Sequence, residues 1–227
     1  MSANFGRKLP ITKPDALAIQ LWLLERKRWR DLALFTLGID SLLRASDLLR
    51  LQVSNVVDQC GAVRSTLVLR QQKTKRPVEC HLSKPTRQAV AHWIAKSGKT
   101  GPDYLFTRLK RTAQPDAPIS AVMYRLLVKQ WVAAIGLDPS RYSTKSLRKS
   151  RVRPILEAAN NDYQVPQILL GHKDIRSTIH YAAIAEETAL ACAARVQFFV
   201  SFQFEKLPPS SRLSPENIDE NQKKSTK

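Results

Sequence analysis

Cysteine is scarce in this chain, and the few that occur are not grouped. Cys60, Cys80 and Cys192 stand far apart with no CxxC pair, which indicates neither a disulfide framework nor a zinc site. We expect them to be small, buried and reduced. Long apolar runs are also missing: no segment has the length that spans a bilayer, and the polar residues 1–10 lack the apolar core of a signal peptide. We therefore expect a cytoplasmic protein.

Acidic residues are few relative to basic ones. The chain has 37 Lys and Arg against 19 Asp and Glu, a formal net charge of +18. Residues 205–227 hold five basic and four acidic residues and so carry only +1 of this excess. The rest belongs to residues 1–204 and predicts a basic surface with a polyanionic partner. Nucleic acid comes first because phosphates dominate the affinity of basic proteins, although an anionic membrane surface would fit the charge alone.

The first third of the chain contains two runs with the period of a strand. Residues 63–70 alternate through Leu67 and Leu69, and residues 78–82 alternate through Val78 and Cys80. The connection between them, residues 71–76, is polar and cationic. This pattern predicts a β-hairpin with a positively charged tip.

Helical periodicity dominates the rest. Thr12 followed by Pro14 is typical of a helix start, and Ser46 with Asp47 of another. We expect helices at residues 16–25, 30–38, 48–51, 84–96, 121–135, 146–159, 164–170, 174–181 and 186–199. The order predicts an α+β fold that is mainly helical, with a small antiparallel sheet. Residues 205–227 are polar and predict a disordered tail.

The segment from 169 to 181 combines several reactive residue types. Gly171 can end a helix in the left-handed conformation, so that His172 would project from a junction between helices. Ile175 and Ile179 lie four residues apart and would anchor the next helix on one apolar face, with Tyr181 near its end. We expect His172 and Tyr181 to converge across a small gap.

A Leu-Gly-His followed nine residues after the His by a Tyr resembles the tyrosine recombinases, also called phage integrases. Three further motifs occur in the family's order. Arg44 precedes Ser-Asp-Leu, Lys73 stands in a Gln-Lys-Thr at the hairpin tip, and Arg148 ends a Lys145-Ser-Leu-Arg that is similar to the family's His-x-x-Arg. The resemblance covers residues 12–200 and implies that residues 12–204 form the catalytic domain.

The resemblance also implies a role for each of these residues. Tyr181 would attack a phosphodiester and form a 3′-phosphotyrosyl intermediate, which stores the bond energy for rejoining. Arg44 and Arg148 would clamp the phosphate, Lys73 would protonate the leaving 5′ oxygen, and His172 would position the phosphate or the tyrosine. This chemistry requires no metal and no cofactor.

The function implied is site-specific DNA recombination or integration by a protein encoded by a mobile element. Its place would be the bacterial cytoplasm, in association with the nucleoid. The expected partner is double-stranded DNA at specific sites, bound by a homo-tetramer with host DNA-bending or directionality factors, and not a membrane. Further cations are expected to contact the DNA: Lys75, Arg76, Lys149 and Lys173.

Two features depart from the family's pattern. Lys145 occupies the usual His position, where a protonated ammonium can bind phosphate but is a poor base. Arg44 comes too early to leave room for a separate N-terminal domain, so we expect a short form that lacks the core-binding domain. Two alternatives stay open. One is a non-catalytic DNA-binding regulator on the same scaffold, which Lys145 favours, and the other is a type IB topoisomerase-like enzyme.

Overall fold

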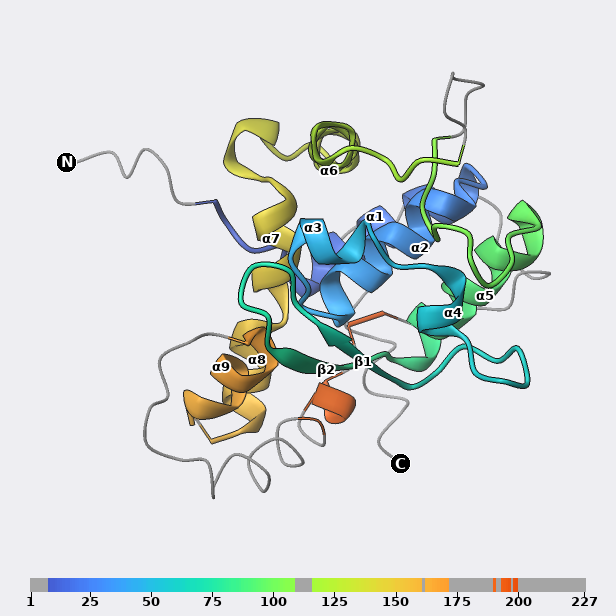
Figure 1. Cartoon of the computed structure of the whole chain (residues 1–227). Coiled ribbons are helices and arrows are strands. Elements are labelled where there is room, and N and C mark those ends of the chain that lie inside the picture. Colours follow the sequence, from blue (N-terminus) through green and yellow to red (C-terminus); the bar gives the residue numbers. More distant parts are fainter. Residues whose placement is uncertain are drawn as a thin grey trace, which may run out of the picture.

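Helix α2 (Trp29–Asp40) lies at the centre of the protein (Figure 1). The computed structural model describes residues 8–108, 116–160, 162–171, 190, 193–196, 198 and 199. Every residue of α2 from 30 to 40 is buried, because α1 (Lys13–Glu25), α5 (Lys84–Ser97) and α7 (Thr144–Ser150) pack around it. A helix that is covered on all sides needs apolar residues all round, which explains the near-continuous apolar run in its sequence.

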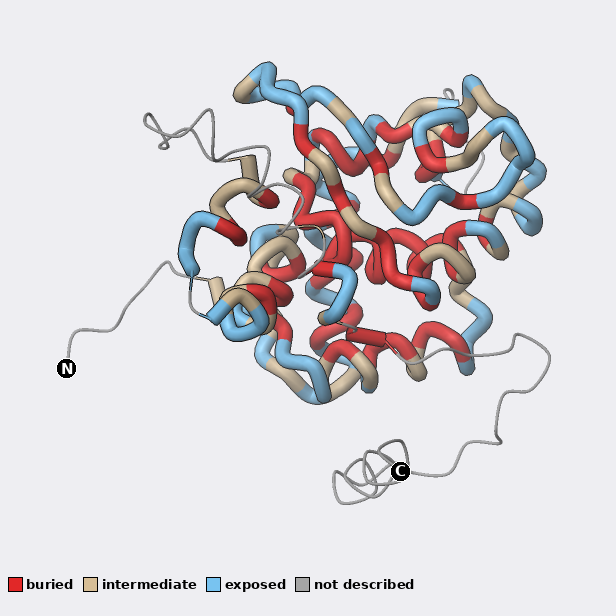
Figure 2. The backbone as a smooth tube through the Cα atoms, turned by 90° about the horizontal axis from the view of Figure 1, so that it is seen from below, coloured by how far each residue is buried: buried red, intermediate tan, exposed pale blue. Residues whose placement is uncertain are grey.

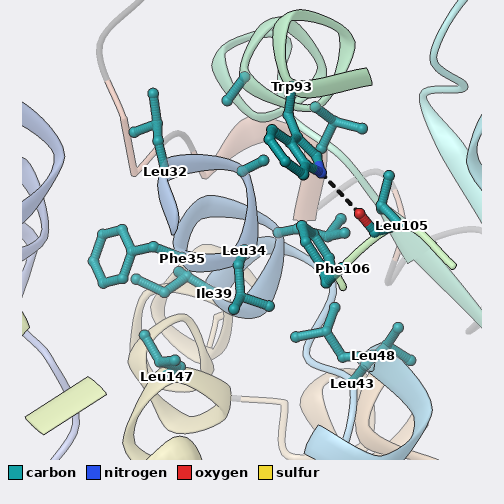
Figure 3. Packing of buried hydrophobic residues seen from close by; sticks show 14 of the residues in the cluster. Leu32, Leu34, Phe35, Ile39, Leu43, Leu48, Trp93, Leu105, Phe106 and Leu147 are labelled. Atoms are coloured by element: carbon teal, nitrogen blue, oxygen red, sulfur yellow. Dashed lines mark hydrogen bonds between the residues drawn. The ribbon is translucent and has the colours of Figure 1, made fainter. Parts of the chain in front are cut away.

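Large apolar side chains fill the space around α2. Phe35 packs edge-on against Trp131, with ring centroids 5.5 Å apart. On another side of the helix the indole of Trp93 donates a hydrogen bond to the carbonyl of Leu105 at 2.7 Å (Figure 3). Buried residues occupy the interior and exposed residues the periphery (Figure 2), so the functional side chains are mounted on a rigid core.

The predicted hairpin is confirmed. Strands β1 (Thr66–Arg70) and β2 (Pro77–His81) pair antiparallel, from Thr66 opposite His81 to Arg70 opposite Pro77. The connection is closed by two backbone bonds of 2.9 Å, from Gln71 N to the Arg76 carbonyl and from Lys75 N to the Gln71 carbonyl. β1 begins later than residue 63, because Val63 pairs instead in an isolated bridge with Val57.

The remaining elements surround this frame. They are α3 (Ala45–Leu48), α4 (Val53–Val56), α6 (Ala121–Ala134), the 3₁₀ turn η1 (Pro139–Arg141), α8 (Val152–Ala158) and α9 (Gln164–Leu170). The helix predicted at 48–51 is wrong in position, since α3 begins at Ala45. Asp47 does not cap it, because it lies inside the helix and Arg44 occupies the N-cap position without a side-chain capping bond. The Asp47 carboxylate instead accepts a hydrogen bond from the backbone N–H of Gln72 at 3.0 Å.

The single helix predicted at 146–159 is also wrong, because the chain forms α7 and α8 with a break at Arg151. Pro154 explains the break. It has no N–H to donate to the carbonyl of Ser150, so the ladder cannot continue, whereas the first turn of a new helix tolerates proline. The break lets Arg151 point into the interior, where it is fully buried.

The prediction that the cysteines are buried is right for one of the two that the structure describes. Cys80 is buried, but Cys60 is exposed, because it lies in a tight turn with Gly61 at φ +79° and its N–H bonded to Asp58. Within the described ranges no helix has the length and hydrophobicity needed to cross a bilayer. The helix predicted at 174–181, half of that at 186–199, Cys192 and the tail at 205–227 lie outside those ranges. Of the described residues in 186–199, residues 190 and 193–195 are helical, whereas 196, 198 and 199 are not, so the end predicted for this helix is wrong.

Candidate active site

Four cationic residues that were predicted to be catalytic line one groove: Arg44, Lys73, Lys145 and Arg148. The groove is open to solvent and has a volume of about 1610 Å³. Arg44 directly precedes α3, and Lys73 comes from the hairpin connection, which extends toward α7 (Figure 1). Lys145 and Arg148 lie three residues apart on α7 and therefore on one face of it. Segments separated by about a hundred residues thus converge on one surface.

The groove is strongly cationic. Among the described residues that line it, Glu157 is the one acidic side chain, and four further residues are basic: Lys8, Arg141, Lys149 and Arg153. Lys149, which the sequence predicted as a DNA contact, thus lines the groove, whereas Lys75 and Arg76 are exposed on the hairpin outside the lining. His172, Lys173 and Tyr181 lie beyond the described residues. Among those described, no three His, Cys, Asp or Glu side chains group as a metal site.

Arg148 is held at the inner side of the groove. Its Nη2 donates to the carbonyl of Leu170 at 2.6 Å, at the end of α9. Burial, together with the positive charge of Arg44, lowers the pKa of Arg148 to about 10, while Asp47 and Cys80 act in the opposite direction. Arg44 and Arg148 repel each other at this half-buried position. An anion bound between them would relieve the repulsion, so the site is suited to an anion.

Arg44 is held by a residue that is not among the predicted site residues. Its Nη1 donates to the side-chain oxygen of Gln71, which is completely buried. A signal for Gln71 was present: positions 67, 69 and 71 continue one strand alternation, so a polar side chain at 71 falls on the inward face. The sequence predicts Asp47 only as part of a helix start, yet its carboxylate accepts a hydrogen bond from the backbone N–H of Gln72 and so holds the start of the hairpin connection.

Cys80 lies close enough to Arg148 and Arg151 to interact with their charges, but its own thiol is uncharged. Burial raises the pKa of its thiol to about 12, against smaller opposing effects of Arg148 and Arg151. The thiol therefore stays protonated at neutral pH. Cys80 therefore supplies no negative charge that would offset that of Arg148.

The sequence from residue 17 to residue 188 matches the model of the phage integrase family. The chain belongs to the phage integrase family. A relative within it, the probable integrase/recombinase YoeC of Bacillus subtilis (strain 168), is 31% identical over 173 residues, which are 76% of this chain and 87% of that protein. Membership confirms the resemblance found in the sequence and the enzyme class that it implied, a site-specific DNA recombinase.

Two solved integrases show the same fold. The integrase from mycobacterium phage Brujita superposes with a TM-score of 0.61 at 16% identity, over 96% of this chain and 64% of that one. The Tn1549 transposon integrase in complex with transposon right end DNA gives 0.55 at 17% identity, over 84% of this chain and 68% of that one. The predicted mainly helical fold with a small antiparallel sheet is confirmed.

Proposed function

We propose that this recombinase cleaves and rejoins DNA strands at specific sites through a 3′-phosphotyrosyl bond to Tyr181. The observation that carries the proposal is the convergence of Arg44, Lys73, Lys145 and Arg148 on one cationic groove. A scissile phosphate bound there would gain charge on its non-bridging oxygens as the nucleophile attacks. Arg44 and Arg148 are close enough for the charge of Arg44 to lower the pKa of Arg148. The added negative charge on the phosphate would stabilise both guanidiniums.

Tyr181, Lys73, His172 and Lys145 would each have a separate role in the reaction. Tyr181 follows ten residues after Gly171, where α9 ends, and its oxygen would bond to phosphorus as the 5′ oxygen leaves. The leaving oxygen needs a proton, and Lys73 on the exposed hairpin connection would supply it. His172, directly after Gly171, would position the phosphate. Lys145 would stabilise the phosphate by its charge, because an exposed ammonium is a poor base.

The wider assignments belong to the same proposal. Residues 12–204 would form the catalytic domain, and double-stranded DNA would be the partner, as in the solved Tn1549 integrase complex. Four protomers would act on two sites, with host DNA-bending or directionality factors, in a protein encoded by a mobile element and associated with the bacterial nucleoid. Lys75, Arg76 and Lys173 would add contacts to the DNA backbone, which fix register without reading sequence.

Covalent capture tests the proposal. Full-length protein is incubated with a pool of nicked duplexes with randomised arms, and adducts that survive detergent are sequenced and mapped by mass spectrometry. We expect a DNA 3′ phosphate on Tyr181, and no adduct from Tyr181→Phe although it still binds DNA.

Binding without any adduct from the natural protein would overturn the proposal and favour the non-catalytic regulator. Relaxation of supercoiled DNA without exchange of strands between two captured sites would favour the topoisomerase-like enzyme. An adduct that persists in Tyr181→Phe would assign the nucleophile to another residue.

A further inference from the structure

Gln71 joins three separate segments of the chain through one buried side chain. Its Oε1 accepts hydrogen bonds from Arg44 Nη1 and from Thr74 Oγ1, the latter at 2.8 Å. Its Nε2 donates to the carbonyl oxygen of Leu170 at 3.2 Å. The residue before α3, the hairpin connection and the end of α9 therefore meet at one amide.

The partners leave a single orientation for this amide. Arg44 brings only N–H donors, so it requires the oxygen, and the Leu170 carbonyl is only an acceptor, so it requires the NH₂. A flipped side chain would place donor against donor and acceptor against acceptor. The network is thus specified chemically and is not a choice between equivalent placements.

The same network reaches the second arginine. The Leu170 carbonyl that accepts from Gln71 also accepts from Arg148 Nη2 at 2.6 Å. Close packing fixes the meeting point: a Cβ on Gly171 would lie 2.9 Å from Gln71 Nε2. The end of α9 therefore sits directly on the Gln71 amide, and Arg148 is anchored to the same carbonyl.

We propose that Gln71 is a positioning residue that ties Arg44, Arg148 and the Lys73-bearing hairpin into one unit. The inference rests on the proposed function for those three residues, because it assigns to Gln71 the setting of their mutual geometry. Gln71 itself is fully buried and does not face the groove. Misplacing reacting groups by about 1 Å can cost on the order of a hundredfold in rate, so an internal tether of this kind controls catalysis without touching DNA.

Hydrogen exchange on the full chain without DNA tests the tether independently of cleavage. Gln71→Met keeps a similar volume and removes all three hydrogen bonds. We expect at least tenfold faster exchange both at Lys75 N–H in the hairpin connection and at Gly171 N–H at the end of α9. Thr74→Val is the matched control, because it removes only the hairpin bond and should speed exchange at Lys75 alone. Unchanged exchange at either amide in Gln71→Met overturns the tether.

Single-turnover cleavage of pre-bound DNA then tests the consequence. We expect Gln71→Met to cleave on the order of a hundredfold more slowly while its Kd for DNA changes less than about threefold. Gln71→Glu keeps the acceptor for Arg44 but cannot donate to Leu170. In this variant the exchange rate should rise at Gly171 N–H and stay unchanged at Lys75 N–H. If Gln71→Met cleaves as fast as the natural protein although exchange at Lys75 and Gly171 is faster, the positioning role is overturned.

A substrate with sulfur in place of the leaving 5′ oxygen separates positioning from general loss of structure. The thiolate departs without taking a proton, so it bypasses Lys73. We expect Lys73→Ala to recover fully on this substrate and Gln71→Met to recover in part, because its arginines stay misplaced. No recovery of Gln71→Met would mean that the hairpin is not under its control. If the natural protein forms no adduct at all, the proposed function fails, while hydrogen exchange still decides whether the tether exists.

Discussion

Asp40 and Arg151 form an ion pair that joins α2 to the start of α8, with 3.2 Å between Asp40 Oδ1 and Arg151 Nη1 and both side chains fully excluded from solvent. The same guanidinium donates to the backbone carbonyl of Asp40 at 2.7 Å and to those of Ala193 and Val196. Arg151 therefore fastens residues 193 and 196 to the end of the central helix. Because it follows Arg148 by three residues, it also fixes the helix that carries the second arginine of the groove.

Removing one partner of this pair should destabilise the protein strongly. Asp40→Ala leaves a guanidinium buried without its counter-charge, and we expect a loss of about 3–5 kcal/mol in the free energy of unfolding, measured by urea denaturation. Glu157→Ala is the matched control. It breaks the Arg153–Glu157 pair, whose side chains are 87% and 59% exposed, and should cost less than about 1 kcal/mol. Equal losses in both variants would refute a structural role for the buried pair.

Substitution by alanine should destabilise the protein more at Gly171 than at Gly98, which also ends a helix in the left-handed conformation. Gly98 ends α5 at φ +65°, and a Cβ added there would meet nothing within 4 Å, whereas Gly171 ends α9 at φ +61° and its added Cβ would lie 2.7 Å from Val78 Cγ1. We expect Gly98→Ala to lose roughly 1–2 kcal/mol from backbone strain alone. Gly171→Ala should lose at least about 1 kcal/mol more, because it also clashes. Thermal and urea unfolding measure the difference, and equal losses would show that the contact with the hairpin is dispensable.

Arg148→Lys should make DNA cleavage sensitive to alkaline pH. Burial and the charge of Arg44 lower the pKa of Arg148 to about 10. A lysine starts from about 10.4, and the same causes should place its pKa well below that value. Since deprotonation on raising the pH removes the charge that holds the phosphate, the variant should lose cleavage on the alkaline side of neutrality, where the natural protein keeps it.

Single-turnover rates between pH 6 and 9.5 measure this effect. Arg26→Lys, in the exposed turn after α1, is the control and should keep the natural profile. A flat profile for Arg148→Lys would mean that the lysine remains charged and that its surroundings are more polar than the structure indicates.

Lys145→His should accelerate the first chemical step. Lys145 is exposed and lines the groove three residues before Arg148. An imidazole titrates near neutrality, so it can accept the phenolic proton of a nucleophilic tyrosine, which a protonated ammonium cannot. We expect adduct formation to rise about tenfold or more at pH 7.5. A slower rate would show that the fixed positive charge of Lys145 matters more than a base at this position.

Local signals were enough to predict most of the elements. Alternation at Leu67 and Leu69 marked the hairpin, and the glycine at 171 marked the end of α9 in the left-handed conformation. These features depend on side chains a few residues apart, which sequence displays directly. The break at Arg151 had its signal too, in Pro154, but the helical periodicity on both sides concealed it.

The order of Arg44, Lys73, Arg148, His172 and Tyr181 along the chain determined the family by itself, because the combination of motifs is specific. Only the tertiary structure decided which charges face the groove and which are buried. Arg148 and Arg151 lie in one basic stretch, and although the motif marked Arg148 for the phosphate, no local pattern predicted that Arg151 is buried. Asp40, 111 residues from Arg151, draws that arginine inside, since a buried charge requires a partner. Gln71, 99 residues from Leu170, bonds to Arg44 and to the Leu170 carbonyl for the same physical reason: a buried polar group must find its hydrogen bonds wherever the fold supplies them.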